Sequence, residues 1–392
     1  MAAGRGGTAP GPGRRPRPRP SARHRRPGGV RGRVLRGHRD HRRGADGRRT
    51  VPARGCRNQL AGHARTQRDH PQDPKRASAL EAAGLQRHRL RSRSLRSVVA
   101  VAGEAIVDLV GDPGTATYRA RPGGSPANVA VALGRLDLPV RLLARLSGDT
   151  FGRMLRAHLE ASGVDLSLCV EAGEPTSLAV ATLDDAGTAA YDFWVRGTAD
   201  WLWAADELPD ALPDDVVALH TGSLEPGASA LEGLLVRERE RGRVALCLDP
   251  NLRPTLMGEA GAVRRRVERQ VGLAHVVRVS EEDLRYSHPD QPYRAVAHRW
   301  LDGGPSLVVV TRGGCGAYGA TRYVEAERPA MPVEVADTIG AGDAFTAGLL
   351  GGLHRRGLLG AGCAAGLAEV DAETLARLLD EANRFAALSL CS

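Results

Sequence analysis

The chain of 392 residues contains a single lysine, Lys75, and this scarcity excludes several mechanisms. A Walker A loop requires Gly-Lys-Ser/Thr and a protein kinase requires a strand lysine, whereas Lys75 is followed by Arg76. Schiff-base chemistry is excluded from the rest of the chain, because no lysine follows Arg76. Any phosphate bound there must meet backbone N–H groups, a metal ion or arginines.

Clustered cysteines and long apolar runs are absent as well. The six cysteines lie far apart, with no C-x-x-C pair and no Cys/His cluster, so neither a zinc site nor a disulfide framework is predicted. No apolar run approaches the roughly 18–20 residues of a membrane-spanning helix. Arg14 and Arg15 precede alternating Pro and Arg instead of the apolar region of a twin-arginine signal. We therefore expect a cytoplasmic protein without a membrane partner.

Positive charge is concentrated in one part of the chain. Residues 1–97 contain 26 Arg and one Lys against five acids, a net charge of +22, whereas residues 98–392 contain 28 basic and 40 acidic residues, a net charge of −12. The overall charge of +10 therefore describes neither part. It gives no argument for nucleic acid as a partner of the folded part.

The basic segment, residues 1–97, consists mainly of Arg, Gly, Pro, Ala and His. Such a segment cannot bury enough apolar surface to offset its ordering entropy, so we predict a disordered extension. One explanation is a basic arm for nucleic acid or another anionic surface. The other is upstream GC-rich sequence translated from a start codon assigned too early. The abrupt change of composition at Val98 favours the second explanation.

From Val98 onward, apolar runs alternate with amphipathic stretches. Strands are predicted at 98–103, 140–146, 216–219, 244–248, 276–279 and 307–311, and helices at 128–136, 151–162 and 228–241. This order predicts an α/β fold, doubly wound, with a mostly parallel central sheet and helices on both faces.

Two polar-alternating strands, 176–183 and 188–195, predict a hairpin across residues 184–187. We expect it to form a small β lid, within about 172–200, that stands off the main sheet. An unpaired strand edge needs cover, so the lid should close over the substrate or pair with the lid of a second subunit in a homodimer.

The most specific motif is Asp-Thr-Ile-Gly-Ala-Gly-Asp at 337–343. Gly340 and Gly342 allow a tight turn and close approach to a ligand. The apolar helix that follows directs unpaired N–H groups into this loop, which favours an anion. Asp343, at the helix start, suits general-base catalysis of phosphoryl transfer to a bound hydroxyl. The alternative is that Asp343 only complements the helix dipole.

Two further motifs offer ligand groups. Gly-Gly-Ser-Pro-Ala-Asn at 123–128 opens a helix, where paired glycines permit backbone contact with a small polar molecule and Asn128 offers donors and an acceptor. The simpler alternative is a helix entry with Ser125 as N-cap and Pro126 in the first turn. Asp108 follows the first predicted strand, at the edge where open α/β sheets bind ligands. The alternative is that Asp108 is an ordinary loop carboxylate.

Residues 314–319 match G-x-G-x-x-G after a predicted strand and so imitate a dinucleotide fingerprint. A true fingerprint opens a helix, whereas residues 320–325 alternate like a strand. We predict a glycine-rich turn that leads into a hairpin and whose N–H groups could hold nucleotide phosphates. A nicotinamide-dependent oxidoreductase that uses these glycines is the less favoured alternative.

Together these motifs resemble those of the ribokinase-like (PfkB) carbohydrate kinase family, from about Val98 to the C-terminus, and look like its fructokinase branch. Asp-Pro-Asn-Leu-Arg at 249–253, Thr-Arg-Gly at 311–313 and Gly-Thr-Ala-Asp at 197–200 support the resemblance. It implies ATP-dependent phosphorylation of a small sugar. Fructose is the first choice, and 2-keto-3-deoxygluconate, ribose and nucleosides are alternatives. A sugar-binding relative without kinase activity is a further alternative.

The resemblance also implies roles for single residues. Asp343 matches the family's catalytic base, and Gly340, Ala341 and Gly342 match its anion hole. The other matches are the sugar-binding positions Asp108, Gly124 and Asn128, the nucleotide positions Thr311, Gly313, Gly316 and Asn383, and the monovalent-cation ligands Asp337 and Ile339. The implied cofactors are ATP, Mg²⁺ and K⁺.

The sequence departs from the family pattern at three places. The Asn-x-x-Glu motif, tied to magnesium and phosphate, appears as Ser-Glu-Glu-Asp at 280–283, so Asp283 keeps a carboxylate one methylene shorter and the amide is lost. The chain ends at Ser392, where relatives continue through a Gly-containing segment that completes the cation and nucleotide sites. This points to a truncated or misassembled C-terminus and leaves K⁺ activation open. The basic extension has no family counterpart.

Overall fold

The computed structural model describes residues 97–391, except 112–116, 184–188, 223–228 and 334–339. The predicted basic extension lies outside the described residues apart from Ser97. Ser97 belongs to the folded part, because Nε2 of His354 lies 2.9 Å from its carbonyl oxygen and 3.2 Å from its Oγ.

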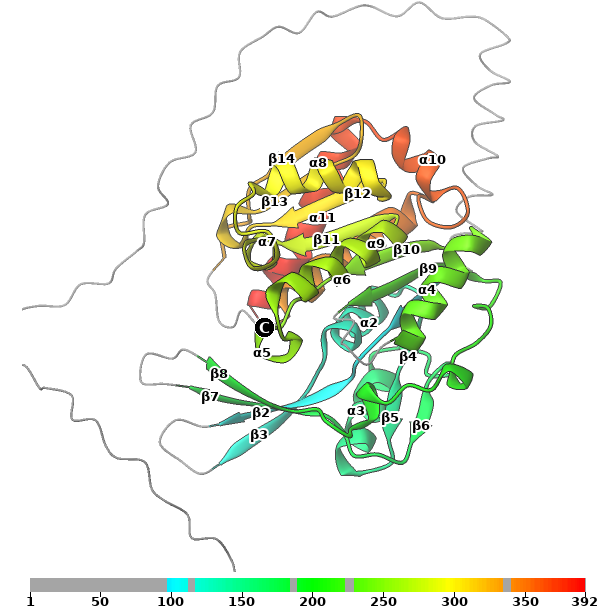
Figure 1. Ribbon diagram of the computed structural model, residues 1–392, viewed down its shortest axis with the longest axis vertical. Coiled ribbons are helices and arrows are strands. Elements are labelled where there is room, and N and C mark those ends of the chain that lie inside the picture. Colours follow the sequence, from blue (N-terminus) through cyan, green and yellow to red (C-terminus); the bar gives the residue numbers. More distant parts are fainter. Residues whose placement is uncertain (1–96, 112–116, 184–188, 223–228, 334–339, 392) are drawn as a thin grey trace, which may run out of the picture. The chain divides into compact units, whose positions relative to one another are not determined.

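An eight-stranded central sheet has the strand order β14-β13-β12-β11-β10-β9-β1-β4 (Figure 1). The strands are β1 (Val98–Ala102), β4 (Val140–Leu143), β9 (Val216–Gly222), β10 (Ala245–Asp249), β11 (Val276–Ser280), β12 (Leu307–Thr311), β13 (Ala317–Ala320) and β14 (Glu325–Arg328). Neighbouring strands from β4 to β12 pair in parallel, and β13 and β14 add an antiparallel hairpin at one edge. The predicted mostly parallel sheet is confirmed.

Helices cover both faces because successive strand residues point to opposite sides. Val99 and Val101 of β1 pack into one core with residues of α2 (Ser125–Arg135), α9 (Ala341–Arg355) and α11 (Ala372–Leu390). Val98 and Ala100 pack into another with α4 (Ser229–Arg241). Val308 and Val310 of β12 pack with α6 (Ala260–Leu273) and α8 (Tyr293–Gly303). The remaining α-helices of the described part are α3 (Thr150–Ala161), α5 (Pro254–Met257), α7 (Glu281–Ser287) and α10 (Cys363–Ala368).

A second sheet of four strands lies outside the central sheet, in the order β3-β2-β7-β8 (Figure 1). It contains β7 (Leu178–Leu183) and β8 (Ala189–Trp194), the two strands that the alternating pattern predicts, and β2 (Ile106–Gly111) and β3 (Tyr118–Gly123), which it does not. β2 connects β3 to the hairpin of β7 and β8, because it pairs with β3 antiparallel and with β7 in parallel. The sequence of β3, Tyr-Arg-Ala-Arg-Pro-Gly, is polar and mostly exposed. It therefore lacks the apolar pattern that predicts a strand in a core.

Two predicted strands have different bounds. The apolar run 140–146 is divided between β4 and β5 (Arg145–Ser147), because β4 pairs with β1 whereas β5 pairs with β6 (Val170–Ala172). Residues 320–325 are mainly a turn and not a strand, since Oγ1 of Thr321 accepts hydrogen bonds of 3.2 Å from the backbone N–H groups of Tyr323 and Val324. The predicted hairpin itself is present as β13 and β14.

Among the residues that the structure describes, no helix combines the length and apolar character needed to cross a membrane.

Candidate active site

A cleft of about 740 Å³ lies between the carboxyl end of the central sheet and the second sheet. Gly103 and Gly222 line it from the ends of β1 and β9. Asp108, Ala179 and Phe193 line it from the second sheet, where they are cross-strand neighbours on one face. Asp343 lines it from the first turn of α9. The fold thus brings predicted site residues from distant parts of the sequence into one cleft.

Asp343 is held by two side chains of α2. Its Oδ1 accepts a hydrogen bond of 2.7 Å from Oγ of Ser125, and its Oδ2 accepts one of 2.9 Å from Nδ2 of Asn128. Helix α9 begins directly after Gly340, whose φ of 77° is left-handed and suits glycine. The predicted anion-hole loop and the Gly-Gly-Ser-Pro-Ala-Asn motif therefore form one structural unit.

Burial raises the pKa of Asp343 to about 6. The hydrogen bonds from Ser125 and Asn128 oppose this shift, the negative charge of Asp249 adds to it, and the positive charge of Arg278 opposes it. A carboxylate with this pKa is ionised at neutral pH and is a stronger base than an exposed aspartate. Such a group is suited to accept a proton from a hydroxyl group.

Ser125 is not the N-cap that the simpler interpretation expects. Gly124 is the N-cap of α2, with a φ of 98°, and the side chain of Ser125 turns toward Asp343 instead. A Cβ on Gly124 would lie only 2.6 Å from the carbonyl oxygen of Glu104. Glycine is therefore required where the helix meets the segment that connects β1 and β2.

Asp108 is not at the end of the first strand, as the sequence pattern suggests, but within β2 of the second sheet. It still lines the cleft, and burial raises its pKa to about 6, against the nearby positive charge of Arg253. Asp200 lines the same cleft and accepts a hydrogen bond of 3.2 Å from the backbone N–H of Ala105. Burial raises its pKa to about 6 as well.

Four aromatic side chains that sequence reasoning did not single out also line the cleft: Tyr191, Phe193, Trp201 and Trp203. The chain contains only four Trp, six Tyr and four Phe, so this concentration is a signal that the sequence offered in the segment after 190. Arg253 and Glu282 also belong to the polar part of the lining. The cleft combines carboxylates, one guanidinium and aromatic faces, which suits a polyhydroxy compound with apolar ring faces.

The predicted nucleotide positions lie around the β12–β13 connection. Gly313 begins a short 3₁₀ turn, Gly313–Cys315, that is closed by hydrogen bonds from Arg312 N–H to Gly316 C=O (2.7 Å) and from Cys315 N–H to Arg312 C=O (3.0 Å). Strand β13 follows this turn, and no helix opens there. The oxidoreductase alternative therefore lacks the helix that a dinucleotide fingerprint requires.

Gly316 and Asn383 meet at the segment that follows β14. The side-chain amide of Asn383, on α11, donates a hydrogen bond of 3.1 Å to the carbonyl of Pro329. A Cβ on Gly316, whose φ is 90°, would lie 2.5 Å from the backbone nitrogen of Ala330. Two predicted nucleotide positions that are far apart in sequence thus flank the same stretch of chain.

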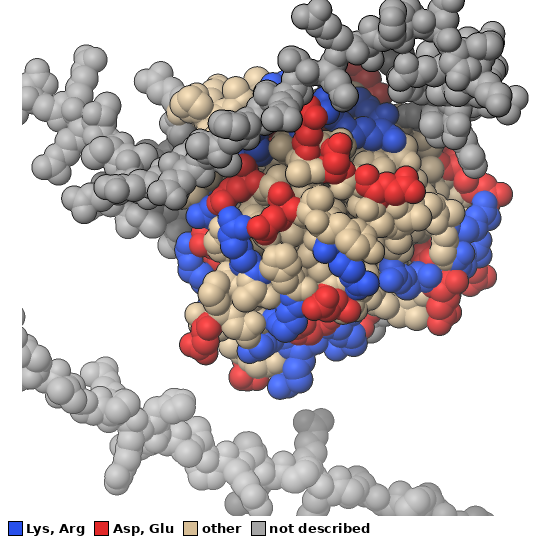
Figure 2. All heavy atoms as spheres, turned by 90° about the horizontal axis from the view of Figure 1, so that it is seen from above, with Lys and Arg blue, Asp and Glu red and all other residues tan. Residues whose placement is uncertain are grey.

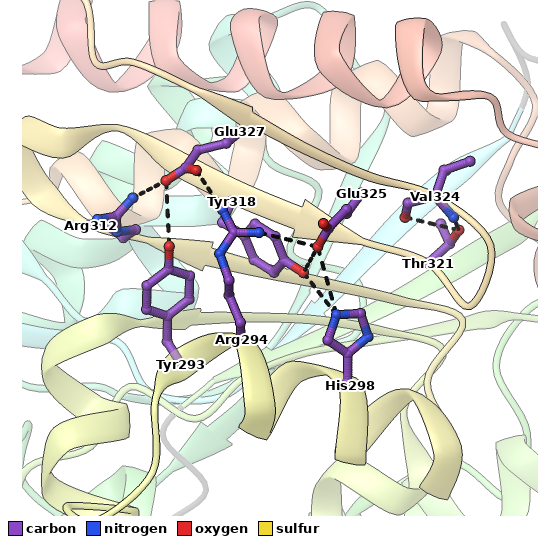
Figure 3. A network of polar contacts seen from close by, with 9 residues as sticks. All are labelled: Tyr293, Arg294, His298, Arg312, Tyr318, Thr321, Val324, Glu325 and Glu327. Carbon is purple, nitrogen blue, oxygen red and sulfur yellow. Dashed lines mark hydrogen bonds and ion pairs between the residues drawn. The ribbon is translucent and has the colours of Figure 1, made fainter. Parts of the chain in front are cut away.

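Arg312, between Thr311 and Gly313, is held by the hairpin (Figure 3). Its guanidinium is ion-paired with Glu327 and lies 4.8 Å from the ring centre of Tyr293. Arg294 of α8 also pairs with Glu327, at 2.6 Å, and continues the network toward Tyr318 and Glu325 (Figure 3). These contacts anchor the predicted nucleotide loop to α8.

The segment 280–283 caps a helix and places one carboxylate in the lining of the cleft. Oγ of Ser280 accepts a hydrogen bond of 3.0 Å from the backbone N–H of Asp283, so Ser280 is the N-cap of α7. Glu282, and not Asp283, lines the cleft. Asp283 is partly buried, and burial together with the charge of Asp249 raises its pKa to about 6. Asp337 and Ile339 lie outside the described residues.

Comparisons with known proteins find fructokinases that are similar to this chain in sequence and in fold. The fructokinase of Rhizobium leguminosarum bv. trifolii is 36% identical over 267 residues, which are 66% of this chain and 80% of that protein. The crystal structure of fructokinase with bound ATP from Xylella fastidiosa has a TM-score of 0.70 and 28% identity, covering 76% of this chain and 93% of that one. A double mutant of fructokinase from Vibrio cholerae O395, bound to fructose, ADP and potassium ion, has a TM-score of 0.64 and 32% identity, covering 76% and 93%.

The family model for pfkB family carbohydrate kinases matches residues 96–392. This match spans the whole described part of the chain, including both sheets and the loop before α9. The motif of 123–128, the loop that precedes α9 and the hairpin after β12 all fall within it. The chain belongs to the pfkB family of carbohydrate kinases.

Proposed function

We propose that this protein transfers the γ-phosphoryl group of ATP to a hydroxyl group of fructose. The observation that carries the proposal is Asp343 at the start of α9, held by Ser125 and Asn128 inside a cleft walled by acidic and aromatic side chains. The similarity to fructokinases supports fructose as the acceptor. 2-Keto-3-deoxygluconate, ribose and nucleosides are the alternatives to test against it.

In this mechanism Asp343 accepts the proton of the attacking hydroxyl group. Its raised pKa allows it to bind that proton in the transition state while it is ionised before the reaction at neutral pH. Ser125 and Asn128 orient the carboxylate, each through one oxygen. The first N–H groups of α9, at Ala341 to Asp343, have no intrahelical acceptor and lie at the positive end of the helix dipole. They would stabilise the charge on the transferred group.

The walls of the cleft would select the sugar. Asp108 and Asp200 offer carboxylate oxygens to sugar hydroxyl groups, and Arg253 offers donors. Trp201 and Phe193 offer flat apolar surfaces to the ring. The second sheet supplies Asp108 and Phe193, so we propose that it acts as the lid of the site.

The residues near segment 280–283 fit a magnesium ion that is bound mainly by the nucleotide. Mg²⁺ in kinases takes one or two carboxylates together with substrate phosphates, and the described residues contain no group of three or more acidic, His or Cys side chains that could hold an ion alone. Glu282 and Asp283 would hold it. When bound, Mg²⁺ would neutralise phosphate charge.

We propose K⁺ as an activator on the family resemblance alone, to be tested by exchange of KCl for NaCl.

We also propose that two copies associate through the second sheet. β3 and β8 are its edges, and each carries an exposed aromatic side chain, Tyr118 at 49% and Trp194 at 55% exposure. Trp194 points away from the cleft, because it neighbours Phe193 on a strand whose residues alternate between faces. A second copy would cover these edges and faces.

The protein is proposed to act in the cytoplasm on small molecules and not on nucleic acid. The described cysteines are free, which agrees with a reducing compartment. On the face shown in Figure 2, basic and acidic side chains are interspersed where undescribed residues do not cover it. Nucleic-acid binding would instead favour a field of one sign.

The deciding experiment is a coupled ADP-release assay with fructose, 2-keto-3-deoxygluconate, ribose and a nucleoside. Fructose is expected to give the highest kcat/KM, and Asp343→Asn serves as the inactive control. ADP release that depends on none of these sugars would contradict the proposal. Oxidation of a nicotinamide cofactor without ADP release would favour the rejected alternative.

A further inference from the structure

Arg278 is a buried arginine at the carboxyl end of the central sheet, with 9% of its surface exposed. Its Nη1 donates a hydrogen bond of 2.6 Å to Oδ2 of Asp249, the last residue of β10. Its Nη2 donates one of 2.6 Å to Oγ1 of Thr311, the last residue of β12. Because Arg278 lies within β11, one side chain ties the ends of β10 and β12 to the strand between them.

The same guanidinium lies directly against the first turn of α9. A Cβ on Gly342 would lie 2.9 Å from Nη2 and 3.2 Å from Nη1 of Arg278, so only glycine permits this close approach. Thr346, one turn later, closes the set: its Oγ1 lies 3.0 Å from the carbonyl oxygen of Gly342 and 3.5 Å from Oδ2 of Asp249. Gly342 is thus connected to the sheet through Arg278 and through Thr346.

Arg278 lies among several carboxylates, and Arg253 is a second cation that lowers the pKa of Asp283. Arg278 forms an ion pair with Asp249, and its charge lowers the pKa of both Asp283 and Asp343 against the effect of burial. His220 of β9 adds no charge, because burial lowers its pKa to about 4. The negative charge of Asp249 raises the pKa of Asp343, so the ion pair acts on the proposed base from both of its members.

We propose that Arg278 is a positioning residue for phosphoryl transfer, which fixes the anion hole at Gly342 relative to Thr311 of the nucleotide loop. One N–H of each Nη atom donates to Asp249 or to Thr311. In this proposal Arg278 acts through the backbone of Gly342 and the side chain of Thr311. This inference rests on the proposed phosphoryl transfer at Asp343.

Three variants separate the effect of the two hydrogen bonds of Arg278, to Asp249 and Thr311, from the effect of its charge. Arg278→Lys keeps the charge, but an ammonium group is a compact donor that cannot replace the planar fork between two acceptors. We expect kcat to fall roughly 10- to 100-fold with a much smaller change in the KM for sugar, because a displacement of about 1 Å in a reacting site costs on the order of 10²-fold. The acid limb of kcat/KM, which is its fall toward low pH, should stay at the same pH, since the charge near Asp343 is kept.

Arg278→Gln removes the charge, so the pKa of Asp343 rises and the acid limb moves to higher pH. Adding Asp249→Asn removes the opposing charge, which should return the acid limb toward its original position while kcat stays low. The shift and its reversal report the charge of Arg278, whereas the low kcat reports the loss of its hydrogen bonds to Asp249 and Thr311. ADP binding, measured by calorimetry, should weaken several-fold in Arg278→Lys because Thr311 loses its donor, and this readout needs no turnover.

Arg356→Lys is the matched control, because Arg356 forms a partly buried ion pair of 2.6 Å with Glu381 near the other end of α9. It should keep the original kcat and ADP affinity. Arg278→Lys with unchanged kcat and ADP affinity would overturn the inference, as would an equal loss in the control. Failure of the unchanged protein to phosphorylate any sugar would instead overturn the proposed function, and the ADP-binding result would still judge the role of Arg278.

Discussion

Asn128 and Asp343 are 215 positions apart in the sequence, and the side-chain amide of Asn128 donates a hydrogen bond of 2.9 Å to Oδ2 of Asp343. The contact joins the start of α2 to the start of α9, which lie on the same face of the central sheet. An amide donor favours the ionised carboxylate and orients its other oxygen toward Ser125. This pair is the basis of the first two predictions.

Asp343→Asn is expected to lower kcat by about 10²–10⁴-fold, the usual contribution of a general base. The KM values for sugar and ATP should change far less, because size and much of the hydrogen bonding are kept. Steady-state kinetics with both substrates measure this. A nearly normal kcat would reduce Asp343 to a residue that complements the helix dipole, and a raised KM with normal kcat would make it a sugar-binding group.

The acid limb of kcat/KM is expected near pH 6, because the base must be ionised and burial raises the pKa of Asp343 to about 6. Asp108 and Asp200 also have pKa values of about 6, so the limb belongs to the set of carboxylates and not to one of them. A profile from pH 5 to pH 8 tests this. A rate that stays constant down to pH 5 would contradict it.

Asp108→Asn should stabilise the folded protein at pH 7.5 while it weakens sugar binding. Burial raises the folded-state pKa of Asp108 to about 6, so its stabilising contribution is complete below the unfolded pKa and is lost as pH rises through 6. The ionised form therefore costs about 1–3 kcal/mol at pH 7.5. Chemical denaturation at pH 4.5 and pH 7.5 measures the difference, which should be small at the lower pH. A variant that is less stable at pH 7.5 would show that Asp108 supports the second sheet instead.

Trp194→Glu should shift the protein from dimer to monomer, because it places a charge on an exposed apolar position of an edge strand of the second sheet. Sedimentation velocity measures the mass, and Tyr323→Glu, an exposed aromatic of the β13–β14 turn at 69% exposure, is the matched control. If the unchanged protein is a monomer at micromolar concentration, the proposed dimer is wrong.

Removal of residues 1–96 should leave the melting temperature and kcat nearly unchanged. The segment lacks the apolar side chains from which a core is built, and the cut keeps Ser97 with its contacts to His354. Thermal unfolding and the sugar kinase assay compare the two proteins. A loss of more than about 1 kcal/mol would show that the extension packs on the domain.

The sequence by itself determined the central sheet, the hairpin of the second sheet and the motifs around Asp343. These features depend on local periodicity and on glycine, proline and acidic residues at short spacing, which a single segment carries. Val99 and Val101 alternate with Val98 and Ala100 in a strand buried on both sides, so the apolar run alone identifies β1. The loop before α9 could be interpreted in the same way, because the helix that follows makes it an anion site.

Only the tertiary structure decided that β2 and β3 join the second sheet, that Ser125 turns to Asp343 instead of capping its helix, and that Arg278 lies beneath Gly342. Each of these features is a pairing between segments far apart in the chain. Sequence periodicity reports which face of an element is apolar, but not which distant element will cover it. Arg278 shows the reason most clearly: in the sequence it interrupts the apolar strand β11, and only the ends of β10 and β12 on either side supply Asp249 and Thr311 as its partners.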